Sequence, residues 1–159
     1  MEPRGGGGHN PATAAPSPPP ASGLASEILA AHNRYRAEVG VAPLQWSESQ
    51  AASAQAWANQ LAATGTFQHS GRSGENLARG TGLGVSQLVD IWGDEKRFFR
   101  NGAFPNVSTS GNWVDVGHYT QVVWRNTTEV AGGLATGQEG TVLVCHYNPP
   151  GNVLGQQVF

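Results

Sequence analysis

The hydrophobic periodicity of this chain changes from helical to strand-like along its length, and this change limits the folds available to it. Three stretches before residue 100 repeat apolar residues at helical spacing. Ser47 opens the second stretch with the pattern "SESQ", which predicts a capping box. We therefore expect three helices, over about 24–39, 47–61 and 85–99.

The C-terminal part of the chain alternates as a strand does. In "TVLVCHYN", residues 141–148, Val142 and Val144 face away from Cys145. This alternation predicts a buried thiol at Cys145 and a surface or edge position for His146. The preceding "AGGLATG" is a weaker strand, which predicts a hairpin. Helices first and strands last favour an α+β fold over a sheet wound between parallel crossovers.

Length and charge exclude several classes of function. A chain of 159 residues is one domain by length, with residues 1–22 forming a Gly/Pro-rich disordered tail and 23–159 the folded part. A net charge of −2 gives no electrostatic footprint for nucleic acid. No apolar run approaches the ~20 residues of a transmembrane segment. No signal peptide is visible after Met1, so either the protein is cytoplasmic or this is a mature chain.

One carboxylate interrupts an apolar stripe. Leu88, Trp92, Glu95 and Phe99 share one face of the third predicted helix. A carboxylate there costs free energy unless something pairs with it. A side chain at the edge of the stripe and a functional group both fit this pattern.

Two histidines and a second carboxylate are possible partners for Glu95. His69 and Glu75 lie on either side of a Gly-rich turn, and His118 follows Gly117. Two imidazoles and two carboxylates suit a divalent-metal site or an acid–base site. Each histidine alone is more often structural, and the HExxH and CxxC spacings are absent, so the signal is weak.

Five motifs follow one another along the chain: "HNRYRAEVGVAPLQWS" (32–47), "HSGRSGENLA" (69–78), "WGDE" (92–95), "GHYTQVVWRNT" (117–127) and "VCHYNPPGNVLGQ" (144–156). With these motifs, the chain resembles over residues 24–159 the CAP superfamily of cysteine-rich secretory, antigen 5 and pathogenesis-related class-one proteins.

The resemblance implies a three-layer α–β–α sandwich, with a small antiparallel sheet between helices and a central cleft. It places His69 and His118 as ligands of a divalent ion, zinc in many members, with Glu75 and Glu95 beside them. Secretion or a cell-envelope location is implied as well.

The chain departs from the eukaryotic pattern at one place. The family's "GCG" stretch is "AGG" here, at 131–133, so Cys145 has no disulfide partner. This departure favours a minimal, bacterial-type member of the superfamily.

Three functions are consistent with these features. The first is binding of a small apolar or lipid ligand, covered by an aromatic loop over 97–113 that contains Phe98, Phe99, Phe104 and Trp113. The second, ranked below it, is a zinc-dependent hydrolase or peptidase that uses Glu75 and Glu95. The third is binding of an extracellular, envelope or host protein, with the cleft serving structure alone.

Overall fold

The computed structural model describes residues 23–159, and the predicted tail over 1–22 lies outside the described residues. The elements follow one another as α1 (Gly23–Glu38), β1 (Gln45–Trp46), α2 (Glu48–Thr64), β2 (Glu75–Gly80), α3 (Val85–Gly93), the 3-10 turns η1 (Asp94–Phe98) and η2 (Trp113–Asp115), α4 (Gly117–Val122), β3 (Glu129–Gly137) and β4 (Gly140–Asn148).

The first two helices lie where periodicity predicts them. In α1, Ile28, Ala31 and Tyr35 are buried at helical spacing, and the chain turns at Gly40 with a φ of 71°. Helix α2 begins after Ser47, as predicted. The predicted capping box is wrong, because the Ser47 hydroxyl bonds the hydroxyl of Ser49 at 3.1 Å and makes no cap bond.

The strands form one sheet in the order β1–β3–β4–β2. β4 pairs antiparallel with both β2 and β3, and the β3–β4 pairing confirms the predicted hairpin, closed by Gly137 opposite Gly140. The two-residue β1 pairs parallel to β3, so the sheet is mixed and not purely antiparallel as expected. A strand of two residues carries no alternation for sequence reasoning to detect.

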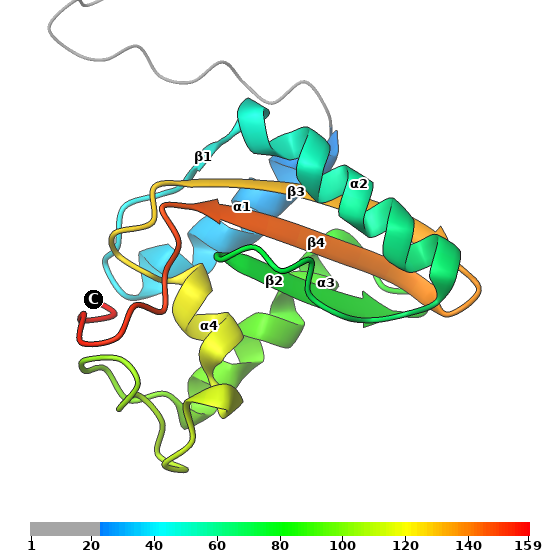
Figure 1. Ribbon diagram of the computed structural model, residues 1–159. Helices are drawn as coiled ribbons and strands as arrows, with labels where there is room; N and C mark the ends of the chain where they lie inside the picture. Colours follow the sequence, from blue (N-terminus) through cyan, green and yellow to red (C-terminus); the bar gives the residue numbers. More distant parts are fainter. Residues whose placement is uncertain (1–22) are drawn as a thin grey trace, which may run out of the picture.

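Helices cover both faces of this sheet, which confirms the α–β–α layering. Figure 1 shows α2 over one face, with α1, α3 and α4 gathered on the other. Alternate residues of β4 feed separate hydrophobic clusters: Val142 and Val144 pack with α2, while Leu143, Cys145 and Tyr147 pack with the other helices. Both faces of β4 are therefore buried.

Buried Arg36 on α1 fixes the segment that leaves α4. Its guanidinium donates to the carbonyl oxygens of Ala42 at 2.7 Å, Val122 at 3.0 Å, Trp124 at 2.8 Å and Thr127 at 3.0 Å. The bond to Val122 satisfies a carbonyl that the end of the short helix α4 leaves unpaired. Arg36 thereby connects the first helix to the segment between α4 and β3.

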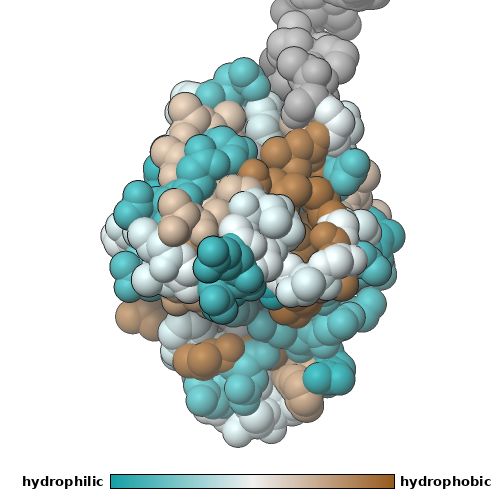
Figure 2. Space-filling model, turned by 90° about the vertical axis from the view of Figure 1, so that its right-hand side faces the viewer, coloured by the Kyte–Doolittle hydropathy of each residue, from teal (hydrophilic) through white to brown (hydrophobic). Residues whose placement is uncertain are grey.

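Apolar side chains at the surface are few and partly clustered. Figure 2 shows one face of the molecule, where apolar side chains form a band and a separate smaller patch among polar side chains. The large apolar side chains that are exposed are Phe67, Ile91, Phe98, Trp113, Val114, Val153 and Leu154. Phe67, Ile91 and Phe98 line two neighbouring pockets, which makes these pockets the place to look for a ligand.

Candidate functional site

A cleft of about 400 Å³ opens between β2, the loop after α2, and the side of the domain formed by α3, η1 and α4. Its volume falls within the range of small-ligand sites. It is lined by Phe67, Gln68, His69, Leu77, Ala78, Arg79, Ile91, Trp92, Glu95 and His118. Both predicted metal-binding histidines and one of the two predicted carboxylates thus line the same cavity.

Glu75 anchors one half of the site. It is the first residue of β2, and no part of its side chain is exposed. Its Oε1 accepts hydrogen bonds from His69 Nδ1 at 2.8 Å and from the Ser70 amide at 2.9 Å. Its Oε2 accepts from the Ser70 hydroxyl at 2.7 Å and from His146 Nε2 at 2.8 Å. All four acceptor positions of the carboxylate are filled.

These hydrogen bonds keep Glu75 ionised. Burial raises the pKa of a carboxyl group, but the bonds from His146, Ser70 and His69 outweigh it and lower the pKa of Glu75 to about 2. A carboxylate that is fully bonded and so weakly basic cannot serve as a general base. Its role is to hold the side chains around it.

Glu95 anchors the other half. Its Oε1 accepts from the amides of His118 and Tyr119, both at 3.0 Å, and its Oε2 accepts from His118 Nδ1 at 2.8 Å. The carboxylate therefore holds both the imidazole and the first turn of α4. Its side chain is 19% exposed, and Oε2 retains one acceptor position.

The position of Glu95 differs from the periodic prediction. The third helix was expected to run to Phe99, but α3 ends at Gly93 and continues as the tighter η1. Glu95 therefore leaves the face that carries Leu88 and Trp92, and turns toward α4. Trp92 remains beneath the cleft, where its indole N–H donates to the Leu77 carbonyl at 2.8 Å and its ring stacks on His118.

His146 is a site residue that sequence reasoning missed. The prediction of a surface or edge position is wrong, because α2 covers its face of the sheet and leaves it 1% exposed. The register of β2 and β4 places it opposite Glu75. Its other ring nitrogen, Nδ1, shares a hydrogen bond of 3.0 Å with the Ser53 hydroxyl on α2. Alternation alone carries no signal for this contact, which depends on strand register.

The two histidines of the cleft each present one ring nitrogen for a ligand. Nδ1 of His69 donates a hydrogen bond to Glu75, and Nδ1 of His118 donates one to Glu95. Nε2 of each ring is therefore the nitrogen whose lone pair can coordinate a metal. Carboxylate–histidine pairs of this kind orient imidazoles toward zinc. Within residues 23–159, no group of three or more His, Cys, Asp or Glu side chains is placed to hold a metal ion. The donor set fits a metal held by two imidazoles, one protein ligand fewer than in a typical catalytic zinc site.

The predicted aromatic loop is divided between the core and the surface. Phe104 is buried against the rings of Trp113 and Trp124, and Phe99 packs against Tyr119. Phe98 and Trp113 are each 41% exposed.

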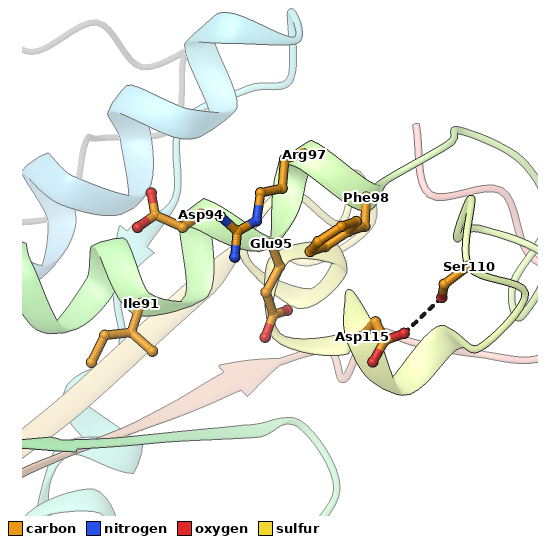
Figure 3. Close-up of a pocket in the computed structure, with 7 residues that line it drawn as sticks. All are labelled: Ile91, Asp94, Glu95, Arg97, Phe98, Ser110 and Asp115. Carbon is orange, nitrogen blue, oxygen red and sulfur yellow. Dashed lines mark hydrogen bonds between the residues drawn. The ribbon is translucent and has the colours of Figure 1, made fainter.

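Phe98 lines a second pocket of about 340 Å³, drawn in Figure 3 with Ile91, Asp94, Glu95, Arg97, Ser110 and Asp115. Ile91 and Glu95 also line the cleft, so the two cavities adjoin. The Ser110 hydroxyl donates to Asp115 at 2.7 Å at one side of this pocket.

Comparison with known proteins places this geometry in a family. Residues 29–147 match the CAP family, described as the cysteine-rich secretory protein family. The chain is 42% identical over 137 residues to pathogenesis-related protein 1B of Nicotiana tabacum, an alignment that covers 84% of this chain and 79% of the relative. It is 38% identical over 136 residues to pathogenesis-related protein 1 of Arabidopsis thaliana, with 84% and 81% covered. These relatives are plant proteins and give no support to the expected bacterial type.

Solved structures share the fold. The structure of BmVAL-1 superposes with a TM-score of 0.71 at 23% identity, covering 91% of this chain and 85% of that one. The crystal structure of NaASP2 with Zn²⁺ gives a TM-score of 0.69 at 22% identity, covering 87% and 86%. Within residues 23–159, no helix is both long and apolar enough to cross a membrane.

Proposed function

Because the chain belongs to the CAP family of cysteine-rich secretory proteins, we propose that it is a secreted binding protein whose cleft holds a divalent metal, zinc by preference, between His69 and His118. The observation that carries this proposal is the matched pair of carboxylate–histidine bonds, each 2.8 Å long, which leaves Nε2 of both rings available. Imidazole nitrogen is a preferred zinc ligand. The related fold of NaASP2, crystallised with Zn²⁺, supports the same choice.

The cleft favours a small amphipathic ligand. His69 and His118 would hold the metal, which would supply positive charge and coordination positions for an anionic group. Exposed Phe67 and Ile91 border the same cavity, and buried Leu77 and Trp92 form part of its wall. A fatty acid combines the carboxylate and the apolar chain that this lining would accept, so lipid binding is the form of the function that we propose.

A hydrolase is the second candidate, and one observation favours it. Glu95 borders the cleft, is partly exposed and retains an acceptor position on Oε2, so it can take a proton from a water molecule there. Glu75, whose acceptor positions are all filled, cannot. If the protein is an enzyme, Glu95→Gln abolishes the turnover that the wild type shows, whereas a binding module shows no turnover in the wild type either.

Zinc titration by calorimetry near pH 7.5 tests the proposal. We expect one-site binding in the wild type and its loss in both His69→Ala and His118→Ala. His9→Ala serves as the matched control, because it removes a histidine outside the described residues and should leave the cleft intact. Equal binding by all four proteins would overturn the proposal.

A further inference from the structure

We infer that His146 is a positioning residue of the proposed metal site, because it holds the Glu75 carboxylate that in turn holds His69. This inference rests on the proposed function. His146 acts on the half of the site that contains His69, and it does not itself line the cleft.

A continuous set of hydrogen bonds connects His146 to two residues of one loop, His69 and Arg72. Glu75 Oε2 accepts from His146 Nε2 at 2.8 Å, and Glu75 Oε1 accepts from His69 Nδ1 at the same distance. On its other side, His146 Nδ1 meets the Ser53 hydroxyl at 3.0 Å, which also accepts from Arg72 Nη1 at 2.9 Å. His69 and Arg72 both belong to the segment between α2 and β2.

The loop contacts explain why the position of His69 depends on His146. Residues 65–74 form neither helix nor strand, so side-chain bonds must fix them against the sheet. Of the four hydrogen bonds that Glu75 accepts, three come from His69 and Ser70 on this loop. The fourth comes from His146 on β4. Without His146, the three remaining hydrogen bonds to the Glu75 carboxylate would all come from the loop that this carboxylate has to position.

The burial of the pair makes this bond costly to lose. The side chains of Glu75 and His146 are 0% and 1% exposed. Water therefore cannot replace the imidazole N–H without rearrangement, and an unsatisfied carboxylate oxygen in the interior would turn toward other donors. Rotation of the Glu75 carboxylate would change the orientation of the His69 ring.

Among residues 23–159, no side chain plays the part of His146 in the second half of the site. The remaining donors to Glu95 are the backbone amides of His118 and Tyr119, which are part of α4 itself. Substitution of His146 should therefore disturb the His69 ring and leave the His118 ring in place. This asymmetry separates positioning from a general loss of stability.

Four variants test the inference through zinc affinity and the protonation pattern of the His69 ring. His146→Leu removes the donor, whereas His146→Gln retains an amide N–H able to reach Glu75. His146→Asn is too short to reach it. Val144→Ala is the matched control, because it opens a cavity on the same face of β4 without touching Glu75.

We expect His146→Leu and His146→Asn to weaken zinc binding on the order of 10-fold, the effect typical of residues behind a metal ligand. His146→Gln should restore most of the affinity, and Val144→Ala should leave it unchanged. Long-range ¹H–¹⁵N spectra of the metal-free wild type should show the His69 proton on Nδ1. In the Leu and Asn variants this tautomer should be lost at His69 and kept at His118.

The spectra separate failure of this inference from failure of the proposed function. Absence of zinc binding in the wild type would remove the metal site, and the His69 tautomer would still report whether His146 positions the ring. Wild-type affinity and an unchanged His69 tautomer in His146→Leu would overturn the inference. If His146→Leu fails to fold, equal affinity and equal tautomers in the Asn and Gln variants would overturn it instead.

Discussion

Ionised Glu75 should stabilise the folded protein in a pH-dependent way. Glu75→Gln should remove this pH-dependent contribution. Burial raises the pKa of this carboxyl group, but the hydrogen bonds outweigh burial and lower the pKa from an ordinary 4.5 to about 2. At about 1.4 kcal/mol for each pH unit between these values, ionised Glu75 stabilises the fold by about 3 kcal/mol. Because the folded-state pKa is the lower one, this stabilisation is complete above about pH 4.5 and is lost as the pH falls toward 2.

Urea unfolding of the metal-free protein, followed by tryptophan fluorescence between pH 7 and pH 2, measures this contribution. The free energy of unfolding of the wild type should fall by about 3 kcal/mol more than that of Glu75→Gln across the acid range. Glu139→Gln, at an exposed position of the β3–β4 turn, should follow the wild type. Parallel curves for the wild type and Glu75→Gln would refute the assignment of a depressed pKa.

Three further predictions concern the scaffold. Gly133→Ala should lower the free energy of unfolding by roughly 1–3 kcal/mol in urea, because the new Cβ would meet the Gln55 backbone of α2, with its nitrogen 2.6 Å away; an unchanged midpoint would contradict this packing. Arg36→Lys should lower the melting temperature, since a single ammonium cannot reach the four carbonyls that the guanidinium joins; full stability would show that these bonds contribute nothing. Burial raises the pKa of the Cys145 thiol, so native protein at pH 8 should resist a thiol reagent that labels it in urea, and rapid native labelling would contradict its burial.

Periodicity predicted the long helices and the hairpin of this fold, the family resemblance implied its layers, and the shortest elements were missed. Helices α1 and α2 and the β3–β4 hairpin are long enough for their apolar spacing to be read. Strand β2 gives no periodic signal, because its first four residues are all buried and therefore show no alternation. Buried Asn76 within it looks unlike a core residue, yet its amide donates to the His118 carbonyl at 3.0 Å. Such a position is understandable only from the tertiary contacts.

The candidate site was predictable as a set of side chains and not as a geometry. The family motifs indicated His69, Glu75, Glu95 and His118, and the structure brings them together as two carboxylate–histidine pairs. Their metal-binding role stays a prediction. The role of His146 was missed, because alternation assigns it to one face of β4 and cannot predict that α2 covers that face.

The aromatic loop illustrates the same limit. Its composition suggested a cover for an apolar ligand, but Phe99 and Phe104 pack inward and leave Phe98 and Trp113 exposed. Composition cannot separate these positions, because each depends on contacts with distant segments such as Tyr119 and Trp124. Of the four aromatic residues predicted to contact ligand, Phe98 lines the pocket that adjoins the cleft.

The most direct test of the metal site is anomalous X-ray diffraction at the zinc absorption edge, from crystals of the full chain grown with zinc. The proposed site predicts one strong anomalous peak in the cleft, about 2.0–2.1 Å from Nε2 of both His69 and His118. Nδ1 of each ring should remain bonded to its carboxylate. A peak at another position, or coordination through Nδ1 with the Glu75 and Glu95 contacts broken, would contradict the account.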